Sequence, residues 1–168
     1  MRAAVLALVL SATALSGCAG FQPLYGEQNV VGNLAAIDVV APEGRTGYLI
    51  RQHLDDRFAK NQGAAPAYRM TLLLNEARYP RGVRIDNVAT RYEYHLTATY
   101  TLTAQPSGSV AKRGSVNVQL TYDSADQPYA SISAQQDAQD RAASEAARLI
   151  ELELAVWLAN TKVASAGK

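Results

Sequence analysis

Residues 92–102, with the sequence YEYHLTATYTL, decide the fold of this 168-residue chain. Apolar side chains stand at every second position of this stretch, and Glu, His and Thr stand between them. Strict alternation over such a length is typical of a β-strand with one buried and one solvent-exposed face. The stretch therefore predicts a strand of an antiparallel sheet that is covered on one side only.

Two further segments repeat this alternation, one on each side of the first. Residues 68–75 and 115–122 place apolar side chains on one face and mostly polar side chains on the other, although Leu73 breaks the pattern. The sequence Gln105-Pro106-Ser107-Gly108 supplies turn residues between the last two segments. We therefore expect three consecutive strands that bury one apolar face.

The remaining chain predicts one more strand and two helices. Residues 34–40 (LAAIDVV) form a short apolar run that is typical of a buried strand. Residues 46–61 switch to helical spacing, with Thr46 as the candidate N-cap, and residues 133–160 predict a long helix. The residues expected to face the core are Ile50, Leu54 and Phe58 in the first helix, and Ala138, Ala142, Ala146, Leu149, Ile150 and Trp157 in the second.

This order of elements predicts an α+β fold. Because a helix connects the first two strands, those strands can run parallel through a right-handed crossover, whereas the other pairs are antiparallel. We therefore expect a two-layer sandwich, in which two helices pack on one face of a four-stranded, mixed but mostly antiparallel sheet. It forms a single domain over residues 33–160, followed by a C-terminal tail at residues 161–168.

The first 18 residues have the pattern of a bacterial lipoprotein signal. Arg2 precedes an uncharged run, residues 3–15, that is too short to cross a bilayer but suits a secretory signal peptide. The run ends in Leu15-Ser16-Gly17-Cys18, which resembles a lipobox. We expect cleavage of residues 1–17, with Leu15, Ser16 and Gly17 recognised by the signal peptidase. The alternative is a membrane-embedded or buried N-terminal helix with an incidental cysteine.

The lipobox resemblance makes Cys18 the lipidation site of the mature protein. It implies S-diacylglycerol and an N-acyl group such as palmitate, which satisfies the need for two or more chains in stable anchoring. Ala19 follows, and by resemblance to enteric sorting rules a residue other than Asp favours the outer membrane. Residues 18–32 carry Gly, Pro, Gln and Asn without periodicity and predict a lipidated tether.

Composition and motifs argue against several functional classes. Sixteen Lys+Arg against 15 Asp+Glu leave no basic excess, which argues against nucleic-acid binding. The chain lacks the H-E-x-x-H, G-x-S-x-G, P-loop and dinucleotide motifs, and His53 and His95 have no catalytic pattern around them. We therefore expect no enzyme, no catalytic residue, no metal site and no cofactor besides the covalent lipid.

Four arginines lie between the second and third predicted strands. Arg78, Arg81, Arg84 and Arg91 alternate with aromatic residues and proline. A guanidinium binds phosphate through two parallel hydrogen bonds, so these residues are candidates for an anionic lipid headgroup. The alternative is a solubilising hairpin whose edge charges prevent strand pairing between molecules.

The chain resembles the LptE family of lipopolysaccharide-assembly lipoproteins, especially its shorter alphaproteobacterial forms. Residues 17–26, GCAGFQPLYG, resemble the family run G-C-G-F-x-P-L-Y-G, with Ala19 inserted after the cysteine. The resemblance continues through the rest of the chain and is carried by Ile37-Asp38-Val39, Arg45-Thr46-Gly47, Asp137-Ala138 and Arg141-Ala142.

This resemblance implies a two-layer plug within the lumen of the Gram-negative outer-membrane β-barrel LptD. The pair would insert lipopolysaccharide into the outer leaflet. The periplasm-facing lipoprotein would also assist barrel assembly and bind lipopolysaccharide. The assignment of this binding to the four arginines is our own and does not come from the resemblance. Two other functions stay open. A free periplasmic lipid-binding or transporter-auxiliary lipoprotein would need an apolar cavity between sheet and helices, and a cell-wall lipoprotein has no supporting sequence feature.

Overall fold

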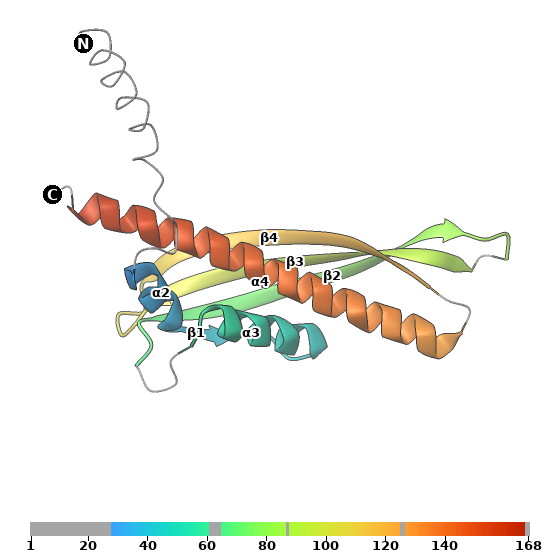
Figure 1. Ribbon diagram of the computed structural model, residues 1–168, viewed down its shortest axis with the longest axis horizontal. Coiled ribbons are helices and arrows are strands. Elements are labelled where there is room, and N and C mark those ends of the chain that lie inside the picture. Colours follow the sequence, from blue (N-terminus) through green and yellow to red (C-terminus); the bar gives the residue numbers. More distant parts are fainter. Residues whose placement is uncertain (1–27, 61–64, 87, 125–126, 167–168) are drawn as a thin grey trace, which may run out of the picture.

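The computed structural model describes residues 28–60, 65–86, 88–124 and 127–166. Figure 1 shows a long helix crossing one sheet, with the smaller helices beside it. The elements are α2 (Gln28–Ala35), β1 (Ile37–Val40), α3 (Arg45–Arg57), β2 (Tyr68–Val83), β3 (Ala89–Ala104), β4 (Val110–Asp123) and α4 (Pro128–Ala166).

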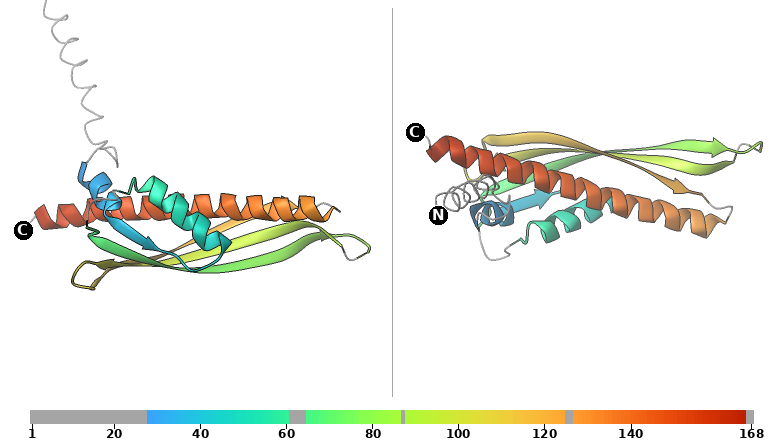
Figure 2. Two further views of the ribbon diagram at one scale, coloured as in Figure 1. Left: turned by 90° about the horizontal axis from the view of Figure 1, so that it is seen from below. Right: turned by 45° about the horizontal axis from the view of Figure 1, so that its top comes forward.

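The sheet confirms the predicted α+β sandwich. Its strand order is β1-β2-β3-β4. The strands β1 and β2 run parallel through α3, and the other two pairs are antiparallel. All helices lie on one side of the sheet (Figure 2), so the opposite face is left uncovered by the described helices.

The prediction was wrong for the segment that precedes β1. The strand was expected to start at Leu34, after a tether over residues 18–32, but residues 28–35 form the helix α2 and β1 begins at Ile37. Val30 and Leu34 lie one helical turn apart and are both buried, because α2 packs against α4. The folded part therefore includes residues assigned to the tether, and α4 likewise continues past residue 160 to Ala166.

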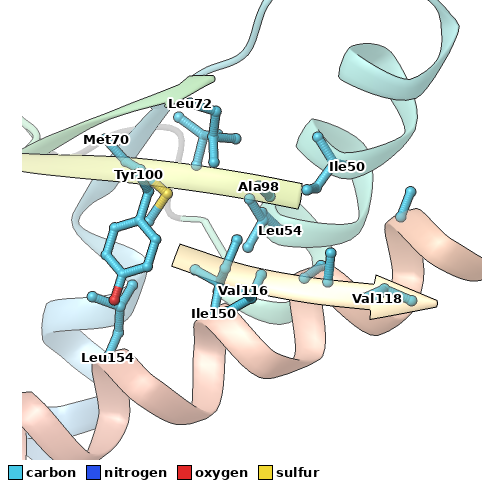
Figure 3. Packing of buried hydrophobic residues seen from close by; sticks show 14 of the residues in the cluster. Ile50, Leu54, Met70, Leu72, Ala98, Tyr100, Val116, Val118, Ile150 and Leu154 are labelled. Atoms are coloured by element: carbon cyan, nitrogen blue, oxygen red, sulfur yellow. The ribbon is translucent and has the colours of Figure 1, made fainter. Parts of the chain in front are cut away.

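The core lies between the inner face of the sheet and the helices. Figure 3 shows side chains of α3 and α4 meeting those of the strands, with Tyr100 among them. The residues expected to face the core from α3 are fully or almost fully buried, and so are the alternating residues of β3 from Tyr94 to Leu102. Removal of this apolar surface from water is the main force that holds the two layers together.

The alanines of α4 let this helix lie close to its neighbours. Its fully buried residues include six alanines, of which the sequence analysis identified three. They are Ala138, Ala142, Ala143, Ala146, Ala147 and Ala155. Farther along the same helix Ile150 and Leu154 are fully buried, whereas Leu149 and Trp157 are only partly buried.

A carboxylate joins the two layers where the apolar core ends. The cap of α3 is Gly44 rather than Thr46. The buried Thr46 hydroxyl instead donates to the Glu76 carboxylate at 3.0 Å, and the Tyr94 hydroxyl donates to the same carboxylate. Burial and the neighbouring Glu76 raise the pKa of the Tyr94 hydroxyl, so it stays protonated and can donate. Glu76 thus ties α3 to β2 and β3.

We predict that Gly47→Ala destabilises the protein by about 1–3 kcal/mol, the usual cost of overpacking. A Cβ at this position of α3 would lie 2.0 Å from the Pro42 carbonyl oxygen, which belongs to the backbone. Gly32→Ala is the matched control, because a Cβ at Gly32 of α2 meets nothing within 4 Å. Urea denaturation measures both variants, and an unchanged unfolding free energy for Gly47→Ala would refute the close contact.

Candidate functional site

The hairpin of β2 and β3 extends beyond the helices and forms an arm. Both strands are 16 residues long and pair as far as Val83 and Ala89. The strand β1 pairs only with the first four residues of β2, and β4 reaches only as far as Arg91. Figure 1 shows the end of this hairpin projecting past the start of α4. The arm is therefore a two-stranded extension of the sheet.

The structure separates the four candidate arginines into different positions on this arm. Arg78 and Arg81 lie in β2 and Arg91 lies in β3, so Arg84 alone belongs to the turn. Arg81 and Arg91 are direct partners across the two strands. Arg78 has the opposite orientation, toward the helices, because residues three apart on a strand lie on opposite faces. The expectation that all four arginines lie between the two strands was therefore wrong, because the strands continue through three of them.

Arg78 joins the base of the arm to α4. Its guanidinium carbon lies 4.7 Å from the centre of the Tyr92 ring. One terminal nitrogen donates to Gln135 of α4 at 2.6 Å and to the Tyr122 hydroxyl at 3.4 Å. These contacts occupy the guanidinium within the protein. Arg78 therefore fixes the arm to the helix and is less available to an external ligand than the other three arginines.

The other arginines each contact a carboxylate on or beside the arm. Nε of Arg81 donates to Glu93, and Nε of Arg91 donates to Asp123, both at 2.8 Å. Arg84 contacts Asp86 of the turn at 3.4 Å. These arginine side chains are about half exposed, and exposed ion pairs contribute only about 0–1 kcal/mol each. A guanidinium has five N–H donors, so Arg81 and Arg91 can accept a further anionic ligand.

Glu93 is the carboxylate with the most contacts on the arm. His95 hydrogen-bonds one of its oxygens and Arg81 the other, and together these partners hold the pKa of Glu93 below its usual range. The ring of Tyr79 packs edge-on against His95, with the centroids 5.0 Å apart. Glu93 therefore stays ionised at neutral pH and competes with any other anion for Arg81.

The turn also presents apolar side chains that the sequence analysis did not single out. Val83, Ile85 and Val88 are all exposed, and Ile85 is 107% exposed. Exposed aliphatic groups beside arginines are unusual on a purely solubilising turn and are typical of contact with lipid or protein. The signal in the sequence was the apolar residues on either side of Arg84, at a point where the alternating pattern had already ended.

The lipidation site lies outside the described residues. Cys18 and the recognition residues Leu15, Ser16 and Gly17 precede residue 28, so their assignment stays a prediction. Among the described helices, none combines the length and hydropathy needed to span a membrane. The described residues also contain no group of His, Cys, Asp or Glu arranged to hold a metal ion.

Known proteins match the chain at the level of family and of fold. A sequence model of the LptE family, described as lipopolysaccharide-assembly, matches residues 34–154. A comparison with curated proteins gives no match. Among solved structures, the chain is similar to a protein from Caulobacter crescentus CB15 that is described as a candidate lipoprotein. The two are 51% identical with a TM-score of 0.69, over 79% of this chain and 97% of the other.

Two more distant structures show the same fold. The rare lipoprotein B of Shewanella oneidensis is 13% identical with a TM-score of 0.57, over 75% of this chain and 96% of the other. An uncharacterised lipoprotein B of Nitrosomonas europaea is 10% identical with a TM-score of 0.54, over 73% of this chain and 83% of the other. Because the family model spans most of the folded part, the chain belongs to the LptE lipopolysaccharide-assembly family.

Proposed function

We propose that this chain is an outer-membrane lipoprotein, anchored through acylated Cys18, that acts as plug and assembly partner of an LptD-type barrel in lipopolysaccharide transport. It has no catalytic role and no cofactor besides the lipid. The observation that carries the proposal is the polar face of the sheet, which the described helices leave uncovered (Figure 2). The interior wall of such barrels is polar, so a polar sheet face can pack against it.

The polar groups of this face bond to one another across the strands. Thr97 donates to Asn117 at 2.6 Å, and the hydroxyls of Thr99 and Ser115 lie 3.2 Å apart. Thr103 donates to the backbone carbonyl of Arg69 at 3.1 Å. Such bonds hold the side chains in fixed positions, so that little side-chain entropy is lost when a second surface packs against them.

The long axis of the protein supports a position through the membrane. The helix α2, which follows the proposed anchor segment, lies near the C-terminal end of α4, and the arm lies at the opposite end (Figure 1). The 39 residues of α4 span about 58 Å at 1.5 Å per residue, whereas the bilayer hydrocarbon is about 30 Å thick. A plug anchored at one leaflet can therefore present its arm at the other.

The filled core argues against a free lipid-binding lipoprotein. That alternative requires an apolar cavity between sheet and helices. Leu96, Tyr100 and Leu102 of β3 are fully buried there, and so are Ile150 and Leu154 of α4. The layers therefore meet directly at the centre of the sheet, and the apolar groove between β4 and α4 lies at the sheet edge, open to solvent.

The function is tested by purification of the lipoprotein from cells grown with labelled palmitate. We expect the protein to carry the label and to bring down a large β-barrel protein in mild detergent, because a plug in a lumen resists extraction. Cys18→Ala is the control for the label. Recovery of a labelled monomer without a barrel would refute the plug and favour the free lipoprotein, whereas an unlabelled protein would refute the anchor.

The arginine assignment predicts a loss of lipopolysaccharide binding when the charges of the arm are reversed. We expect the triple variant Arg81→Glu, Arg84→Glu and Arg91→Glu to bind purified lipopolysaccharide at least about tenfold more weakly, since charge-assisted hydrogen bonds contribute about 1.5–3 kcal/mol each. Glu93→Gln should strengthen binding, because it removes the carboxylate that competes for Arg81. Binding is measured on the intact lipoprotein.

The matched control reverses three arginines on the helices, Arg51, Arg141 and Arg148. These side chains are as exposed as those of the arm and also contact carboxylates. We expect this control to change the lipopolysaccharide affinity by less than about twofold. Equal losses in the two triple variants would indicate a net-charge effect, and no loss in the arm variant would return the arginines to a solubilising role.

A further inference from the structure

A shallow apolar groove runs along the outer flank of α4. It has a volume of about 570 Å³ and lies between the first half of β4 and the C-terminal half of the helix. Its apolar lining consists of Val116, Leu149, Leu152, Val156 and Trp157. Leu152 and Val156 are 41% and 44% exposed, so their aliphatic side chains are in contact with water. This surface is unrelated to the arm at the other end of the protein.

The groove is open because the sheet ends at β4. That strand pairs only with β3, and no described segment lies along its other edge. Lys112 of β4 and Glu153 of α4 pair at 2.8 Å at the groove, so its charged groups compensate one another. An occupant therefore needs to supply apolar side chains and no net charge.

We propose that residues 21–25 of this chain, Phe-Gln-Pro-Leu-Tyr, occupy the groove. Four of these five residues have apolar or aromatic side chains, and residues 18–26 contain no charged side chain. The segment is therefore complementary to the groove in both respects. Its docking requires neither the acyl group nor a barrel, so this inference is independent of the proposed function.

The chain length allows this contact. The described residues begin at Gln28, the first residue of α2, and α2 packs against α4 (Figures 1 and 2). Tyr25 and Phe21 precede Gln28 by three and seven positions, which allow spans of up to about 10 Å and about 23 Å at 3.3 Å per residue. A helix with its side chains is about 10–12 Å across, so the segment can pass over α4 and reach its outer flank.

The tether favours this occupant over a free lipid or a second copy of the chain. A ligand on a short flexible linker has an effective concentration in the millimolar range, without any cost of bringing two molecules together. Occupation of the groove would also place Cys18, three residues before Phe21, beside the C-terminal half of α4. The lipid anchor would then hold the folded domain through a short segment with a fixed direction.

Trp157 reports on the groove, because it lines the groove and is the single tryptophan of the chain. We compare acrylamide quenching of the mature lipoprotein in phospholipid vesicles with that of the triple variant Phe21→Ser, Leu24→Ser and Tyr25→Ser. The quenching constant should rise at least about twofold in the variant, as water reaches the indole. The control replaces Val83, Ile85 and Val88 of the turn with serine and should leave the quenching constant unchanged. Equal quenching in all three proteins would overturn the proposal.

A cross-link tests the contact without removing it. Oxidation of the lipoprotein with Leu24→Cys and Val156→Cys should give an intramolecular disulfide. The pair Leu24→Cys and Tyr48→Cys should give little, because Tyr48 is exposed on α3, away from the groove. Similar yields for the two pairs would overturn the docking. A disulfide that joins two chains would likewise overturn it and assign the groove to a second copy.

Discussion

The close contact between the alanines of α4 and its neighbours is the constraint on which the rest of the structure depends. Alanine has the highest helix propensity of all residues, so these residues stabilise the 39-residue helix. Its side chain is a single methyl group, so the helix can approach β4 and α3 closely. The large fully buried side chains come from the strands, with Tyr100 of β3 among them, from α3, with Ile50 and Leu54, and from the later part of α4. This division leaves one face of the sheet polar and one flank of α4 open.

Glu76 marks the end of the apolar run on the inner face of β2. The buried Met70 and Leu72 and the partly buried Leu74 precede it at alternate positions, and at Glu76 a carboxylate takes the place of the next apolar group. Beyond it, β2 pairs with β3 as far as Val83, β4 pairs with β3 as far as Arg91, and Arg78 joins this part of the sheet to α4. The inner face of β2 is therefore apolar toward α3 and polar toward the arm.

The sheet and the two larger helices could be predicted because each carries a long, regular pattern. The helix α2 could not, because eight residues with two core contacts, Val30 and Leu34, are too few to show a period, and only packing against α4 stabilises them. The length of β2 was missed because its alternation stops at Asn75, after which pairing with β3 alone continues the strand. The arginines could be found by their composition, but their pairing with Glu93 and Asp123 depends on strand register, which the sequence does not show.

The pairing of the arginines has a consequence for a protein that handles a transported ligand. Unpaired arginines that converge on a phosphate would bind it strongly and release it slowly, because dissociation would leave several like charges facing one another. If the arm binds phosphate as proposed, a leaving phosphate would be replaced at Arg81 by Glu93, which remains ionised because His95 and Arg81 lower its pKa, and at Arg91 by Asp123. Each exchange substitutes one charge-assisted hydrogen bond for another. Such an arm is suited to a transient contact with an anionic headgroup, which the proposed role in transport requires and a storage protein would not.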